Sequence, residues 1–188
     1  MAGNDRDVRL IGAHGGYRQL KSYQGAEIIL DATVRFCERF INRYSRTTDQ
    51  MIQAARSGKQ NIAEGSMASA TSKKTELKLV GVARASLEEL LLDYEDFLRQ
   101  NRLPAWGKGD GQAEQVRQLV YRSDRSYETY KTYVEKASAE VAANTLLCLI
   151  HQTNYLLDQQ LRRLERDFLE EGGFTEKLYR LRRQGPRI

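Results

Sequence analysis

The sequence predicts an all-α protein, and two observations support this. Long segments of the 188-residue chain repeat apolar residues at alternating steps of three and four, the spacing of one helix face. Only two prolines are present, Pro104 and Pro186, and both lie outside those segments, so the helices can be long. The length fits one domain, or one domain with an extension.

The first helix is expected from Leu20 to about Tyr44. Its seam contains one charged residue, Glu27, and consists of Leu20, Tyr23, Glu27, Leu30, Val34, Cys37, Ile41 and Tyr44. A second stripe beside the seam comprises Ala26, Ile29, Thr33, Phe36 and Phe40. The combined face is wider than a two-stranded coiled coil requires, so this helix is expected to contact several neighbours.

The segment 56–70, RSGKQNIAEGSMASA, has the composition of a loop but keeps helical phase. We expect it to lie within a second helix from about Gln50 to Ser69, capped by Thr48 or Asp49. The packing stripe of that helix is Met51, Ala55, Gly58, Ile62 and Gly65. Its glycines would let a neighbouring helix approach closely, which offsets their poor helix propensity.

A third helix is expected from a cap at Ser72 to about Gln100, and Leu103-Pro104 ends it. Its seam has one charged member, Arg84, and comprises Leu77, Val80, Arg84, Leu87, Leu91, Tyr94 and Leu98. The glycine-rich stretch PAWGKGDG (104–111) is expected to be a loop.

Helical periodicity resumes after this loop. One series consists of Val116, Val120, Ser123, Tyr127, Tyr130, Val134, Ala137 and Val141, and the next of Leu147, Ile150, Asn154, Leu157, Leu161, Leu164 and Phe168. They predict one or two helices leading into a long last helix, which Gly172-Gly173 ends. The expected organisation is a flexible N-terminus (1–16), a helical domain (17–171) with an insertion (104–143), and a basic tail (172–188).

Polar residues on or beside the predicted core stripes are expected to meet in one structural network. Its members are Glu27, Asn61, Glu64, Arg84 and Glu88, with Arg84 donating to both Glu27 and Glu64. The alternative is a catalytic site built on the three carboxylates and Arg84, which would need a solvent-connected cavity around them.

Other kinds of chemistry lack their motifs. The two histidines do not follow a glutamate by three residues, as an inward-facing metal bundle would require, and no phosphate-binding loop is present. Cys37 and Cys148 are expected to be buried thiols, and the pairing of Cys148 with His151 favours packing over thiol catalysis. No cofactor is expected. The N-terminal sequence lacks a signal peptide and no segment has the length of a membrane span, so we expect a soluble, cytoplasmic protein.

A formal net charge of +5 is compatible with nucleic acid as a partner. The candidate phosphate-binding residues are Arg56, Lys59, Lys73, Lys74, Lys78, Arg180, Arg182 and Arg183, although the lysines equally fit a solvated helix face. Tyrosines interleaved with basic residues after Val120 could stack on bases or line an interface, and helix packing is the alternative for Tyr127 and Tyr130.

Three sequence motifs, KSYQ (21–24), NIAEG (61–65) and VARASLEEL (82–90), resemble a bacterial family of four-helix-bundle proteins. Its members are encoded in intervening sequences of ribosomal RNA genes and are related to the accessory variability determinant of diversity-generating retroelements. The resemblance covers about residues 17–103 and the last helix. Residues 144–161 and the ending FLEEGGF (168–174) are similar to a subgroup with a C-terminal suffix.

The resemblance implies an antiparallel up-and-down four-helix bundle without enzyme activity. It also implies a homo-oligomer, often a pentamer, whose basic surface binds nucleic acid and whose retroelement relatives bind a reverse transcriptase. Two departures are visible: Ser57-Gly58-Lys59-Gln60 replace the family's usual proline before NIAEG, and residues 104–143 are inserted.

These observations lead to two functional hypotheses of different classes. In the first, the protein is a non-enzymatic, homo-oligomeric helical bundle that binds RNA or DNA through its basic surface. In the second, it is a protein–protein adaptor whose wide apolar faces and tyrosine-rich insertion dock another protein. Salt dependence separates them, because phosphate contacts weaken steeply as salt rises.

Overall fold

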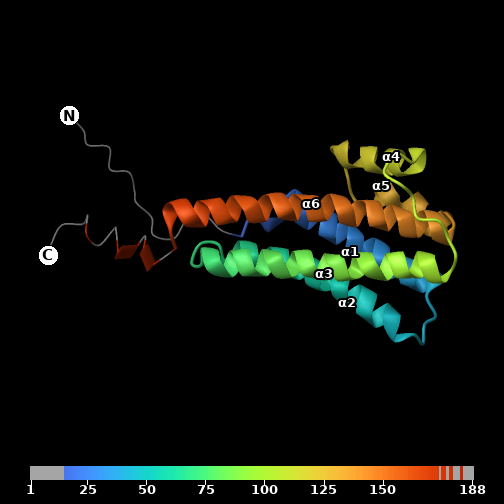
Figure 1. The fold of residues 1–188 in the computed structure, drawn as a ribbon, viewed down its shortest axis with the longest axis horizontal. Helices are drawn as coiled ribbons and strands as arrows, with labels where there is room; N and C mark the ends of the chain where they lie inside the picture. The colour runs from blue at the N-terminus through green and yellow to red at the C-terminus, as the bar shows by residue number, and fades with distance from the viewer. Residues whose placement is uncertain (1–14, 174, 177, 180–182, 184–188) are drawn as a thin grey trace.

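The computed structural model describes residues 15–173, 175, 176, 178, 179 and 183, and the secondary structure of this part is entirely helical (Figure 1). The prediction of an all-α fold is therefore confirmed. Four long helices are present: α1 (Lys21–Phe40), α2 (Arg46–Ala68), α3 (Lys73–Gln100) and α6 (Ala139–Glu171). Each of them packs against two of the others, α1 and α3 both lying between α2 and α6. In the described part of the chain, no helix combines the length and apolar character needed to cross a bilayer.

Serines define where three of the long helices begin. The Ser45 hydroxyl accepts a hydrogen bond from the Thr47 amide, so α2 starts at Arg46 and not near Gln50, as Thr48 or Asp49 would require. Ser72 accepts from the Thr75 amide and begins α3 where the sequence predicted. Ser138 caps α6 in the same way through the Val141 amide, so the last helix starts at Ala139, within the predicted insertion that was expected to end at Ala143.

The buried face of α1 is centred on the second predicted stripe rather than on the seam containing Glu27. Ala26, Ile29, Thr33 and Phe36 are all fully buried, whereas Glu27 is exposed. The seam runs along the flank of this face, and only its members Tyr23 and Cys37 are buried. Glu27 therefore lies in solvent and is not a polar residue of the core.

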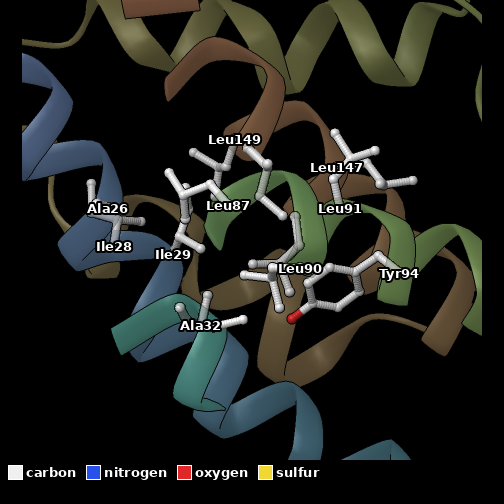
Figure 2. Close-up of a cluster of buried hydrophobic side chains, with 14 of the residues drawn as sticks. Ala26, Ile28, Ile29, Ala32, Leu87, Leu90, Leu91, Tyr94, Leu147 and Leu149 are labelled. Carbon is white, nitrogen blue, oxygen red and sulfur yellow. The ribbon is translucent and has the colours of Figure 1, made fainter. Parts of the chain in front are cut away.

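The core lies between the four long helices, and Figure 2 shows the part of it that α1, α3 and α6 contribute. Leu87, Leu90 and Tyr94 of α3 are fully buried in it. The Tyr94 hydroxyl donates to Thr33 Oγ1 of α1 at 3.0 Å, so the one polar atom of this large side chain is paired.

The stripe predicted for α2 is buried throughout, and the segment 56–68 is helical. A methyl group at Gly58 would lie 2.7 Å from Leu87 Cδ2 and 2.8 Å from Leu87 Cγ, and one at Gly65 would lie 3.4 Å from Leu79 Cβ. The glycines therefore allow α2 and α3 to approach each other closely. The loop-like composition of the segment reflects this contact.

The insertion, for which the sequence predicted one or two helices, contains short helical segments. They are α4 (Gly111–Gln118), a 3₁₀ turn η2 (Leu119–Tyr121), α5 (Tyr127–Lys131) and a π-helical turn η3 (Thr132–Lys136). Figure 1 shows α4 lying outside the four long helices, alongside α6. Val116, Tyr130 and Val134 are fully buried and join the core cluster, so the insertion packs on the long helices through few apolar side chains.

Candidate nucleic-acid interface

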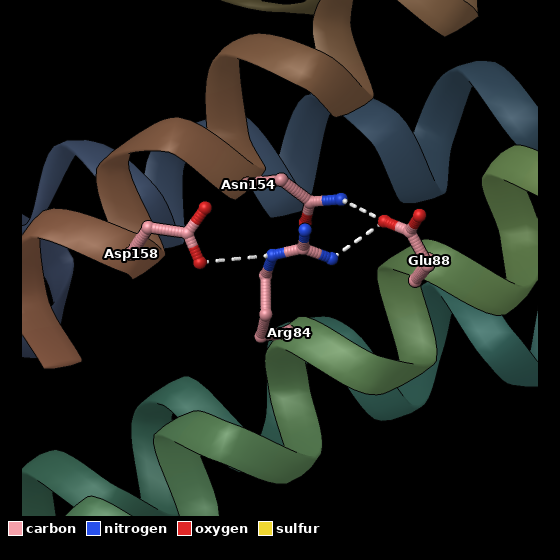
Figure 3. A network of polar contacts seen from close by, with 4 residues as sticks. All are labelled: Arg84, Glu88, Asn154 and Asp158. Atoms are coloured by element: carbon pink, nitrogen blue, oxygen red, sulfur yellow. Dashed lines mark hydrogen bonds and ion pairs between the residues drawn. The ribbon is translucent and has the colours of Figure 1, made fainter.

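A polar network joins α3 to α6 through Arg84 (Figure 3). Arg84 Nε donates to Asp158 Oδ1 at 3.1 Å, and its Nη1 donates to Glu88 Oε2 at 2.5 Å. Asn154 Nδ2 donates to the same Glu88 oxygen at 3.2 Å. The side chains of Arg84, Glu88 and Asp158 are 28%, 45% and 44% exposed, so solvent screens these ion pairs.

The structure brings together two of the five residues predicted to share a network, Arg84 and Glu88. Arg84 bonds to neither Glu27 nor Glu64, and both of these carboxylates are exposed. Asn61 donates back to the Ser57 carbonyl and hydroxyl oxygens of its own helix, at 2.9 and 3.2 Å. Arg84 faces α6 rather than α1 or α2, so its second acid is Asp158. The alternative catalytic grouping of these carboxylates is likewise not assembled.

The predicted phosphate-binding residues lie on separate elements. Arg56 and Lys59 are in the middle of α2, and Lys73, Lys74 and Lys78 are in the first turns of α3. Lys73 Nζ donates to the Asp167 carbonyl of α6 at 3.5 Å, while Lys74 and Lys78 are exposed. The Arg183 guanidinium lies 5.7 Å from the Tyr179 ring centroid, and Arg180 and Arg182 lie outside the described residues.

A groove of about 940 Å³ separates the insertion from the outer face of α6. Its floor is formed by α6, its wall by loop 105–108, α4, η2 and residues 122–125, and its ends by side chains of α1 and α3. Its apolar lining includes Ala113, Val120, Leu147 and Leu156. Cavities of about 300–1,000 Å³ hold ligands of drug size.

Asn144 of α6 fixes the loop that forms one wall of this groove. This side chain is 2% exposed. Its Oδ1 accepts from the Trp106 amide at 2.8 Å, and its Nδ2 donates to the carbonyl oxygens of Pro104 and Glu140, both at 2.9 Å. Trp106 Nε1 also donates to Glu140 Oε1 at 3.4 Å. The indole therefore lines the groove from a backbone that α6 holds in place.

A second pair of hydrogen bonds holds α4 across the groove. Gln152 Nε2 of α6 donates to the Arg117 carbonyl oxygen at 3.1 Å, and Arg117 Nη2 donates to the Lys108 carbonyl oxygen at 2.7 Å. The Gln152 Oε1 atom is buried and has no hydrogen-bond partner within the described part of the chain. Hydrogen bonds from side chains to backbone carbonyl oxygens thus connect α6, α4 and the loop that contains Lys108 around the groove.

Charge is distributed unevenly around the groove. Five basic side chains line it against one acid, Glu95: they are Lys21, Lys108, Arg117, Arg122 and Arg125. Arg122 also forms an ion pair with Asp124 at 3.0 Å, and Asp124 does not line the groove. The hydrogen bond from Arg122 to Asp124 raises the pKa of Arg122. Even after that pair is set aside, basic groups exceed acids, so the groove attracts anions.

Cys148 and His151 both line the groove, one turn apart on α6. Burial raises the pKa of the Cys148 thiol, so the thiolate is scarce at neutral pH. This favours the packing interpretation of the pair over a thiol nucleophile. Within the described residues, no group of three or more His, Cys, Asp or Glu side chains could hold a metal ion.

None of the six predicted phosphate-binding residues that the structure describes lines this groove, and the basic residues that line it were not among the predicted ones. One signal was present: Tyr121, Arg122 and Arg125 stand close together in a segment already noted for base stacking or an interface. Asp158 also follows Asn154 by one turn, and Asn154 interrupts an apolar series. Only the folded chain shows that Tyr121, Arg122 and Arg125 line the groove. It alone shows that Asp158 pairs with Arg84.

No family model, curated protein or solved structure matches this chain.

Proposed function

We propose that this protein is an antiparallel up-and-down four-helix bundle, non-enzymatic and homo-oligomeric, that binds nucleic acid through the groove between the insertion and α6. The assembly and the absence of catalysis follow from the family that the sequence resembles. The single observation that supports nucleic acid as the ligand is the excess of five basic side chains over one acid around a preformed groove. Phosphate groups gain from such contacts by releasing counterions.

Salt dependence of binding tests the proposal. Fluorescence anisotropy with labelled RNA and DNA of mixed sequence is expected to show affinity that falls steeply between low and moderate salt. If three to five phosphates are contacted, the plot of log K against log salt has a slope of roughly −2 to −4. Absence of binding, or binding that is insensitive to salt, would contradict the proposal and favour the protein-adaptor function.

Charge reversal locates the interface. The double variant Lys108→Glu/Arg122→Glu changes two exposed residues at the groove and is expected to weaken binding and flatten the salt slope. The matched control, Lys74→Glu/Lys78→Glu, makes the same charge change in α3, roughly 30 Å along the helix from Glu95. If the control lowers affinity and the groove variant does not, the α3 surface is the interface and the groove is not.

A further inference from the structure

The groove also carries aromatic side chains that phosphate binding does not explain. Trp106, Tyr121 and Tyr155 line it together with His151. Tyr121 and Tyr155 are 80% and 63% exposed, whereas the core rings of Phe36 and Tyr94 are fully buried. Exposed rings beside basic groups form the combination with which proteins hold unpaired bases and the phosphates between them.

We propose that the groove takes unpaired bases of a single-stranded nucleic acid, stacked on Trp106, Tyr121 and Tyr155, with the adjoining phosphates on its basic side chains. This inference rests on the proposed function and specifies its ligand. Bases of a duplex are stacked on one another and cannot present their faces to side chains, so only unpaired bases fit this chemistry.

The aromatic side chains come from elements that are already held in place. Asn144 fixes the backbone of Trp106, Tyr155 projects from α6, and Tyr121 ends the turn that follows α4. Little ordering of the protein is then needed when a base enters, which lowers the entropic cost of binding. The groove volume of about 940 Å³ lies within the range that holds drug-sized ligands, which is sufficient for a base with its sugar.

Acidic residues limit where the phosphates can lie. A neighbouring cleft of about 480 Å³ shares Lys21, Gln24, Ser123 and Arg125 with the groove. It adds three acids, Glu27, Asp31 and Glu128, and only one further basic residue, Arg18, so it has no excess of positive charge. Burial and the nearby Glu27 raise the pKa of Asp31. The phosphates are therefore expected on the side of Lys108, Arg117 and Arg122, and the strand is not expected to continue into this cleft.

The sole tryptophan of the chain, Trp106, reports directly on base entry. A single-stranded 12-nucleotide oligomer is expected to quench its fluorescence, while an abasic strand of the same length is not. Affinity is expected to be at least fivefold higher for the single strand than for a duplex of the same sequence or for the abasic strand. Parallel RNA and DNA oligomers establish which sugar is preferred, and either result is compatible with stacking.

Substitution of one exposed tyrosine separates stacking from charge. Tyr155→Ala is expected to lower affinity for the single strand about 5- to 100-fold and to leave affinity for the abasic strand unchanged. Tyr155→Phe retains the ring and is expected to retain affinity. The control Tyr44→Ala removes a tyrosine that is even more exposed (79%) and does not line the groove, and it is expected to have no effect.

The outcomes distinguish this inference from the proposed function. Equal affinity for the single strand, the duplex and the abasic strand, with unchanged Trp106 fluorescence, would overturn base stacking and leave phosphate binding intact. Failure of all three to bind would overturn both, and the exposed rings would then favour a protein partner.

Discussion

The four long helices and the insertion are held in different ways. α1, α2, α3 and α6 pack through continuous stripes of apolar residues, and close helix approach is built into α2 by its glycines. The insertion buries only a few apolar side chains and is fixed by side chains of the long helices that bind its backbone, including Asn144, Gln152 and Arg39. Stability is therefore concentrated in the long helices, and the groove lies where the two regions meet. Changes in one region should be separable from changes in the other.

The largest effect is expected from Phe36→Ala, in the centre of the long helices. Phe36 is fully buried, and its ring centroid lies 4.9 Å from those of Tyr94 and Phe97. Removing this ring should lower the free energy of unfolding by about 3–5 kcal/mol, measured by urea denaturation. The control Leu169→Ala, at a site that is 77% exposed, should change it by less than about 0.5 kcal/mol. A loss below about 1.5 kcal/mol for Phe36→Ala would contradict the assignment of stability to this core.

Two glycine substitutions test whether close helix contact is required. Gly58→Ala would place a methyl group against fully buried Leu87 and should destabilise the protein by about 1–3 kcal/mol, despite the better helix propensity of alanine. Gly81→Ala introduces the same residue within α3, where no atom outside the adjacent residues and the local helix backbone lies within 4 Å of the new carbon. It should stabilise by roughly 0.5–1 kcal/mol in thermal or urea unfolding. Equal effects at the two sites would show that α2 and α3 do not constrain each other as the structure indicates.

The same contrast explains what the sequence could predict. The α2 stripe was predicted residue by residue, because the helical period alone selects Met51, Ala55, Gly58, Ile62 and Gly65 as one face. The pairing of Arg84 with Asp158 was not predicted, because Asp158 lies on another helix. The apolar period of each helix does not specify the register between the two helices. The prediction that Glu27 lies in the core was wrong for a related reason. Two neighbouring stripes of the first helix are both largely apolar, and only packing decides which of them is at the centre of the buried face.

The groove was even harder to predict from the sequence than the partner of Arg84. Its basic residues come from α1, the 105–108 loop, α4 and the segment before α5, so no local motif contains them. The periodic series from Val116 to Val141 predicted one or two helices, whereas a 3₁₀ turn and a π turn interrupt this segment. Tyr121, in the 3₁₀ turn, and Arg122, directly after it, line the groove. The composition of the segment indicated an interface without locating it.

A smaller and more local effect is expected from Asn144→Ala. This change removes the acceptor of the Trp106 amide and the donor to Pro104, so the insertion loses one of its attachments to α6. The free energy of unfolding should fall by about 1–2 kcal/mol. Hydrogen exchange should accelerate mainly in residues 104–138, with little change in α2 and α3. Uniform acceleration throughout the long helices would show that the two regions unfold together and would contradict their separate stabilisation.

The smallest effect is expected from Arg84→Ala, although Arg84 joins α3 to α6 through its ion pair with Asp158. Its ion pairs with Glu88 and Asp158 are partly exposed to solvent, so their removal should cost no more than about 1 kcal/mol, and less at 1 M salt. The control Arg35→Ala breaks a pair within one helix whose side chains are both more than half exposed, and should cost at most about 0.5 kcal/mol. A loss of 3 kcal/mol or more for Arg84→Ala would mean that the network behaves as a buried ion pair. In a buried pair, removing the arginine leaves its carboxylate partners unpaired and away from solvent, which is strongly destabilising. We expect the Arg84 network to fix the register of α6 on α3 rather than to add much stability. That register determines which face of α6 forms the floor of the groove.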